Sequence, residues 1–193
     1  MSDLDPASFG RAEDALAAFA AGLRYEDIPE KVRHEARRSI LNVIATAFSG
    51  AGEPAIDIAL KTMSRFSPGG GSALIGRPER TDPSLAAALN AMAANIFDYD
   101  DNHPPTIIHP AAPVAPALFA SAEMDRQSGK DLIRAFVVGG EITCRIGLAM
   151  SPYHYARGWH ITSTCGIFGA AAGVGALLGL PAERQHWAAA NAA

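Results

Sequence analysis

The stretch from residue 161 to residue 181 constrains the fold most, because it contains no Lys, Arg, Asp or Glu. It is rich in Gly and Ala and is just long enough to raise the question of a membrane span, which takes about 20 apolar residues. However, it starts with the polar run Thr162, Ser163 and Thr164 and lacks aromatic and basic anchors on both sides. We therefore expect a helix over residues 162–180 that is buried in a large helical core, and no membrane span.

Apolar residues recur at helical spacing in most of the remaining chain, and Gly, Pro and Ser punctuate the pattern. Asp82 followed by Pro83 is typical of a helix start, and Ser128 is a second candidate N-cap. Residues 72–76 could form an isolated extended segment. The predicted helices cover residues 7–22, 32–48, 54–66, 83–96, 114–124, 129–150 and 162–180, and a last one begins at Pro181. The predicted fold class is therefore all-α, as a multi-helix domain.

Charge and cysteine content exclude several classes of function. The 16 basic and 20 acidic residues give a net charge of -4 and form no basic stripe, which argues against nucleic-acid and membrane-surface partners. The only cysteines, Cys144 and Cys165, lack the spacing of a metal site or a disulfide framework. The acidic N-terminus lacks the basic start and apolar core of a signal peptide, so we expect a cytoplasmic protein without a bound metal.

Titratable residues cluster between Phe97 and Pro110. The prolines of this segment disfavour a regular helix or a central strand, so the cluster is expected on a loop. Carboxylates near imidazoles suit proton transfer at neutral pH. The same residues could instead cap a helix end and interact with solvent, and composition alone leaves both interpretations open. The clustered residues are Asp98, Asp100, Asp101, His103 and His109.

A second polar segment, residues 153–160, precedes the uncharged helix and contains His154, Arg157 and His160 among three aromatic residues. His160 is expected at a helix N-terminus, where free backbone donors and the helix dipole favour an anionic ligand such as a carboxylate. The small residues of the following helix would allow close packing and bring this loop against its neighbours. The alternative is an aromatic cap on a core helix.

With both loops placed, the chain resembles the MmgE/PrpD family. The most specific match is Asp98-Tyr99-Asp100-Asp101 followed by His109-Pro110, and it is supported by Gly158-Trp159-His160 with its small-residue helix. The resemblance extends over essentially the whole chain. Further matching segments are residues 28–32, 36–42 and 87–95.

The resemblance implies a lyase that acts on small polycarboxylates without a cofactor or metal, with Asp98, His109 and His160 in its active site. The reaction would be a 2-methylcitrate dehydratase-type elimination, or a related decarboxylation or isomerisation. His109 and His160 would act as the acid–base pair, and Asp98 would orient one imidazole as a buried carboxylate. His103 and Arg157 are predicted to bind substrate, Arg157 through bidentate contacts to carboxylates.

The resemblance also implies that residues 1–193 form the family's N-terminal helical domain, incomplete at its C-terminal end and without the α+β domain and catalytic lysines that follow. The chain would then be one part of a split enzyme, with a partner chain that supplies the missing domain. The alternative is a catalytically inactive, truncated helical subunit that acts as a dimerising or binding module. In either case we expect a homodimer, because a missing domain would leave apolar surface exposed.

Overall fold

The computed structural model describes residues 7–193 of the chain, with side chains from residue 12 onward, and this region is mainly helical. Two short antiparallel strands, paired through Ser72 with Thr81 and Ala73 with Arg80, are its only sheet within the described residues. The prediction of an all-α domain is therefore confirmed. The elements are α1 (Ala7–Gly22), η1 (Tyr25–Asp27), α2 (Glu30–Gly50), α3 (Pro54–Met63), β1 (Ser72–Ala73), β2 (Arg80–Thr81), α4 (Pro83–Asn95), α5 (Ala111–Asp125), α6 (Gly129–Met150), α7 (Tyr153–Ala156), α8 (Ile161–Leu177) and α9 (Ala182–Ala192).

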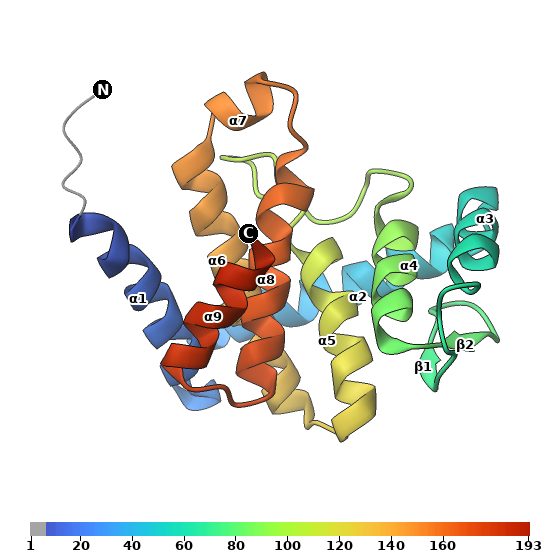
Figure 1. Cartoon of the computed structure of the whole chain (residues 1–193), viewed down its shortest axis with the longest axis horizontal. Helices are drawn as coiled ribbons and strands as arrows, with labels where there is room; N and C mark the ends of the chain where they lie inside the picture. The colour runs from blue at the N-terminus through green and yellow to red at the C-terminus, as the bar shows by residue number, and fades with distance from the viewer. Residues whose placement is uncertain (1–6) are drawn as a thin grey trace.

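Helix α8, the uncharged stretch, lies at the centre of the molecule and packs against α5, α6 and α9 (Figure 1). Many of its residues are buried, as expected for a core helix. No single helix in the described part of the chain is long and apolar enough to cross a membrane. Helices α2 and α3 reach that length and apolar composition only when taken together, and a 90° bend separates them.

Glycines bring α6 and α8 together. A Cβ added at Gly139 of α6 would lie 2.7 Å from the backbone oxygen of Gly169 in α8, so neither helix backbone leaves room for a side chain. The Thr143 hydroxyl donates to the Gly139 carbonyl at 2.9 Å and lies against Gly169. The expected close packing of the small-residue helix is therefore observed, and it fixes the position of the N-terminus of α8.

Helix starts follow the predicted caps. The Asp82 side chain accepts hydrogen bonds from the backbone N–H groups of Ser84 and Leu85, and the Ser128 side chain accepts one from Asp131. Helix α5 begins at residue 111, three residues before its predicted start, because Pro113 fits the first turn of a helix, where its missing N–H has no cost. The second polar segment, residues 153–160, is predicted as a loop but contains the one-turn helix α7.

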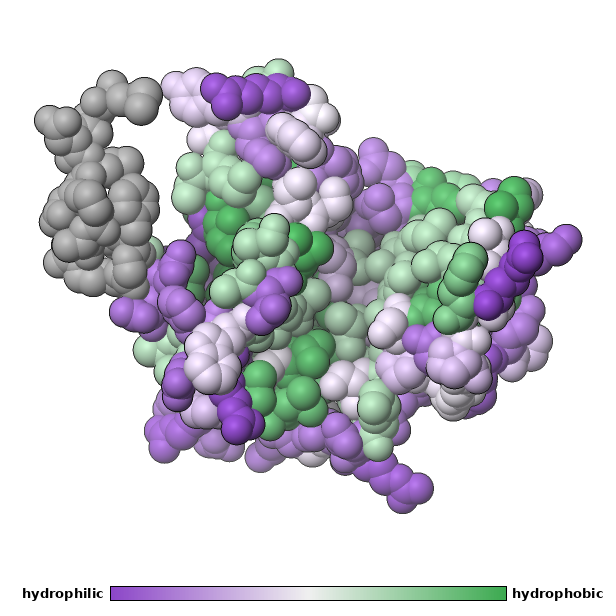
Figure 2. All heavy atoms as spheres, in the orientation of Figure 1, coloured by the Kyte–Doolittle hydropathy of each residue, from purple (hydrophilic) through white to green (hydrophobic). Residues whose placement is uncertain are grey.

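Exposed apolar side chains gather in several areas of the surface. On the face drawn in Figure 2, apolar residues gather over the end formed by α3 and α4 and again around α8 and α9, whereas polar residues line the edges. On α2, which lies at the back of Figure 1, Leu41, Ile44 and Phe48 are 66%, 40% and 68% exposed. Their spacing of three and four residues places them on one face of the helix.

Candidate functional site

Residues 97–110 connect α4 to α5 and are called the site segment below. This segment passes beside the upper end of α8 in Figure 1. It contains no strand or helix, as its prolines predict, and is closed by a bridge in which the His103 N–H donates to the Ile108 carbonyl at 2.8 Å. Ile108 is fully buried and contacts Gly147 of α6, so the segment is anchored in the core one residue before His109.

The His109 imidazole lies between two carboxylates. Its Nε2 is 3.4 Å from Oδ1 of Asp98, and its Nδ1 is 3.1 Å from Oδ1 of Asp100. The contact between Nδ1 and Asp100 has the distance of an ion pair but not the alignment of a hydrogen bond. Neither His109 Nδ1 nor Asp100 Oδ2 has a hydrogen-bond partner among the described residues. The structure thus brings together two of the three predicted catalytic residues and adds Asp100.

The two carboxylates differ in exposure. The Asp98 side chain is 81% exposed, whereas that of Asp100 is fully buried and accepts a hydrogen bond from Asn95 Nδ2 at 3.0 Å. The expectation that Asp98 is the buried carboxylate is therefore wrong, because Asp98 adopts a left-handed conformation (φ 55°) just beyond the end of α4 and its side chain faces solvent. The buried carboxylate beside His109 is Asp100.

This arrangement brings an imidazole and two carboxylates into direct contact. Two carboxylates within ion-pair distance stabilise positive charge on an imidazole that has taken up a proton. The ring itself is only 14% exposed, so it is held in one place, while Asp98 leaves its outer side open to solvent. A fixed imidazole that opens toward solvent on one side meets the geometric requirement for a general acid or base.

His160 lies at the N-cap of α8, as predicted, and its side chain is exposed. Its Nδ1 is 3.1 Å from the Ser163 hydroxyl. Two residues further on, the Thr162 hydroxyl accepts a hydrogen bond from the backbone N–H of His109 at 3.1 Å. The site segment is therefore joined to the first turn of α8, which places His109 and His160 on neighbouring backbones.

The loop before α8 is held by His154. Its Nε2 is 2.7 Å from the Thr164 hydroxyl, and its ring stacks on Trp159 with centroids 6.0 Å apart. Arg157 is exposed and makes no ion pair within the described part of the chain. No contact among those residues joins Arg157 to His109, so its role in substrate binding stays a prediction.

His103 makes a local contact instead of one to the cluster. Its Nδ1 is 2.7 Å from the Thr106 hydroxyl, and Thr106 donates its backbone N–H to the His103 carbonyl. These contacts close a turn within the site segment. Binding of substrate by His103 therefore stays a prediction. The structure also offers a different role for this residue, which is to close the turn.

Asn42 was missed as a contributor to the site, and Asp101, one of the clustered acids, holds a helix end as the alternative interpretation of the cluster predicts. Asn42 Oδ1 of α2 accepts the backbone N–H of Asp101 at 2.9 Å, and Asp101 Oδ1 accepts that of Ala111 at 3.1 Å. Burial raises the pKa of Asp101 to about 6. Asn42 and Asp101 both fall in segments that carry the family resemblance, but nothing in their spacing indicates that they are bonded to each other.

Asp98, Asp100 and His109 also form a group that could hold a metal ion, because one donor atom from each lies within 4.8 Å of the others. A metal ion would take one nitrogen of the imidazole, whereas here each nitrogen faces a carboxylate. The three side chains thus form a network in which each imidazole nitrogen already has a carboxylate within ion-pair distance.

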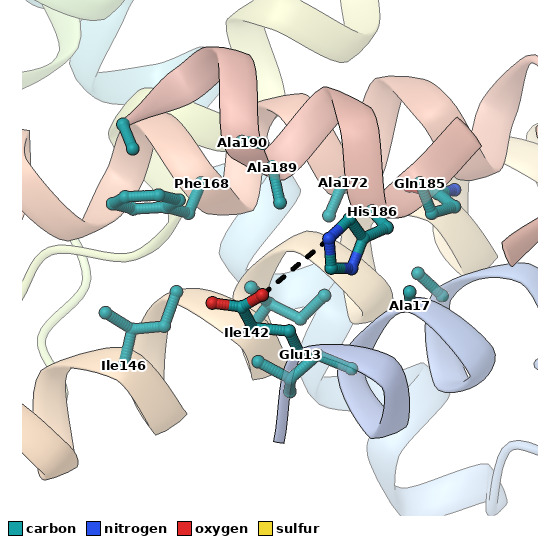
Figure 3. Close-up of a pocket in the computed structure, with 13 residues that line it drawn as sticks. Glu13, Ala17, Ile142, Ile146, Phe168, Ala172, Gln185, His186, Ala189 and Ala190 are labelled. Carbon is teal, nitrogen blue, oxygen red and sulfur yellow. Dashed lines mark ion pairs between the residues drawn. The ribbon is translucent and has the colours of Figure 1, made fainter. Parts of the chain in front are cut away.

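A cavity of about 290 Å³ lies elsewhere, among α1, α6, α8 and α9. Figure 3 shows Glu13 and His186 facing each other beside it, with Glu13 Oε2 and His186 Nε2 3.7 Å apart. The remaining lining is mostly apolar and includes none of the predicted site residues. The His109 cluster, and not this cavity, is the candidate site, because the Glu13–His186 pair is exposed and such pairs contribute little beyond holding two helices together.

The fold and the site define a helical domain that presents an imidazole between two carboxylates at the N-terminus of a core helix. The model of the MmgE/PrpD N-terminal domain matches residues 14–193, and the chain belongs to this family.

Curated relatives are named as decarboxylases. The chain is 34% identical to a cis-aconitate decarboxylase-like protein, oryM, of Aspergillus oryzae over 93% of its own length, and 34% identical to the cis-aconitate decarboxylase of Aspergillus terreus over 89%. It is 31% identical to the human cis-aconitate decarboxylase over 93% of its length. The chain spans only 39%, 36% and 38% of these three relatives, respectively.

Proposed function

We propose that the chain is the helical, site-bearing part of a lyase that decarboxylates cis-aconitate or a closely similar unsaturated polycarboxylate. The observation that carries the proposal is the His109 imidazole, held between Asp98 and Asp100 beside the N-terminus of α8. The names of three relatives that match nearly all of this chain support decarboxylation over dehydration of 2-methylcitrate.

In a decarboxylation, the bond between the carboxylate carbon and its neighbour breaks and CO₂ leaves. The electron pair of that bond remains on the substrate, where it is delocalised into the adjacent double bond, and a proton must then be delivered to carbon. We assign this delivery to His109 or His160, since an imidazole is suited to transfer a proton near neutral pH. In the dehydratase alternative, the same pair would remove the proton beside a carboxylate and protonate the departing hydroxyl group.

The two carboxylates would have different roles. Asp100 is buried and bonded to Asn95, so it would orient the imidazole and stabilise its positive charge. Asp98 is exposed and can contact substrate or exchange a proton with it. The N-terminus of α8, with His160 at its cap, would attract a substrate carboxylate through its free N–H groups and dipole.

Complete activity would require groups that lie outside this chain, since it spans less than two fifths of the relatives. We propose that a partner chain supplies the second domain and its lysines, which makes this chain one part of a split enzyme. The alternative is an inactive helical subunit that retains only the family's packing surface. A neighbouring reading frame that encodes the second domain would distinguish the two.

We also propose a homodimer that buries the exposed face of α2. Leu41, Ile44 and Phe48 follow one another along this face and are each at least 40% exposed. Apolar side chains in a continuous row on a helix surface are typical of an interaction site.

The test of the proposed function is turnover of cis-aconitate by wild-type protein, His109→Gln and His34→Gln, each with the product of the neighbouring reading frame where one exists. His34 is exposed on α2, away from the site, and provides a control with the same chemical change. We expect His109→Gln to lower turnover by about 100-fold or more, since general acid–base catalysis is worth about 10²–10⁴-fold. Near-normal turnover by His109→Gln would remove this residue from the mechanism.

A further inference from the structure

Asp101 joins three parts of the molecule. Its backbone N–H donates to Asn42 Oδ1 of α2, and its side-chain Oδ1 accepts from the N–H of Ala111, the first residue of α5. Ser39, three residues before Asn42 and therefore on the same face of α2, lies close enough to the Asp101 carboxylate to lower its pKa. A single residue thus connects the start of the site segment, its end and a neighbouring helix.

These bonds lie next to the contact at the centre of the site. Asp100 directly precedes Asp101, and His109 lies two residues before Ala111. The 3.1 Å distance between Asp100 and the His109 imidazole therefore depends on how the two ends of the segment are held relative to each other. Besides the bridge between His103 and Ile108, the site segment has no strand or helix that would fix this distance.

We propose that Asp101 is a positioning residue, which fastens the Asp100 end of the site segment to its His109 end and to α2 and so sets the distance between Asp100 and His109. The catalytic consequence rests on the proposed function, whereas the positioning is a property of the folded chain. Asp101 does not need to contact substrate to have this role.

The charge on Asp101 is sensitive to pH in the range in which the enzyme would be assayed. Burial is the main cause of its raised pKa, and the charge of Asp100 adds to it, while the bond from Ala111, the nearby Ser39 side chain and the charge of His109 oppose it. From α6, Cys144 faces the same region, and burial raises the pKa of its thiol to about 11, with further contributions from Glu141 and Asp101. The groups that α2 contributes, Ser39 and Asn42, carry no charge.

The test compares Asp101→Ala with Asp101→Asn by NMR on the folded chain, with the Ala111 amide and the His109 ring as reporters. Asp101→Ala removes the acceptor, so we expect the Ala111 amide to exchange with solvent about tenfold faster and the His109 ring signals to move. Asp101→Asn keeps an oxygen in the same place and should restore both. In wild-type protein the Ala111 amide shift should change between pH 5 and pH 7, and this step should be absent from Asp101→Asn.

Asp82→Ala is the matched control, because Asp82 also accepts backbone N–H groups at a helix start, that of α4, and lies outside the site segment. It should leave the Ala111 and His109 signals unchanged. The proposal is overturned if Asp101→Ala leaves these signals unchanged or if Asp82→Ala moves them equally. If Asp101→Ala does not fold, the absence of a pH step at Ala111 in wild-type protein would overturn it.

Turnover of cis-aconitate in the same variants separates this proposal from the proposed function. If Asp101 positions His109, kcat should fall in Asp101→Ala and recover in Asp101→Asn, with little change in KM. If the proposed function is wrong, no variant turns over substrate, yet the NMR differences between Asp101→Ala and Asp101→Asn remain. If only the positioning is wrong, Asp101→Ala retains wild-type kcat.

Discussion

Two adjacent glycines of α6 should respond in opposite ways to the same substitution. A Cβ at Gly139 would lie 2.6 Å from a methyl group of Val114 and 2.7 Å from the backbone oxygen of Gly169, whereas a Cβ at Gly140 meets nothing within 4 Å. Alanine is favoured over glycine in a helix by about 1 kcal/mol at either position. At Gly139 the backbone oxygen of α8 cannot move away as a side chain could, so overpacking of about 3 kcal/mol outweighs this gain.

We therefore expect Gly139→Ala to lower the free energy of unfolding by about 2 kcal/mol and Gly140→Ala to raise it by up to about 1 kcal/mol. Both differences can be measured by urea unfolding, monitored by circular dichroism, provided that the free energy of unfolding depends on urea concentration with a similar slope in the three proteins. Equal effects, or a stabilised Gly139→Ala, would refute the argument that contact between the backbones of α6 and α8 positions the N-terminus of α8.

Three further predictions concern the site and the surface. Asp98→Asn should change the free energy of unfolding by less than about 0.5 kcal/mol, because asparagine tolerates the left-handed conformation, whereas Asp98→Ala should lower it by about 1 kcal/mol. A loss above about 0.5 kcal/mol in Asp98→Asn, measured by urea unfolding, would contradict this expectation. Burial raises the pKa of Asp101 from 3.8 to about 6, so folded protein binds this proton more tightly than unfolded protein does. The free energy of unfolding of wild-type protein should therefore fall by about 2 kcal/mol relative to Asp101→Asn as the pH rises from 4 to 7. A difference that does not depend on pH would show that Asp101 ionises normally. Phe48→Ser should shift the protein toward monomer in sedimentation experiments, and an unchanged mass would exclude the α2 face from the proposed dimer.

Helix starts could be predicted from the sequence because they depend on local chemistry. Asp82 with Pro83 and Ser128 mark helix starts that need only the next three residues. The buried α8 was also predictable, since a stretch without charges in a globular protein belongs in the core. The predicted start of α5 is three residues too late, because Pro113 occupies the first turn of the helix instead of preceding it.

The composition of the site was predictable, but the roles of its carboxylates were not. Asp98 and Asp100 are two residues apart, and only the left-handed backbone at Asp98 decides which one faces solvent. The bond between Asn42 and Asp101 joins residues far apart in sequence, so it depends on how α2 packs against the rest of the domain. No local pattern indicates such a bond.

The proposed function places the proton-transfer site of a polycarboxylate lyase on this chain, at His109. The most direct measurement is the release of CO₂ from cis-aconitate by purified protein, alone and with the product of any neighbouring reading frame that encodes the second domain, with 2-methylcitrate tested in parallel. Our account predicts CO₂ release from cis-aconitate when the second domain is supplied, and loss of that release in His109→Gln. Absence of turnover of either substrate in the complemented protein, or turnover that does not depend on His109, would contradict it.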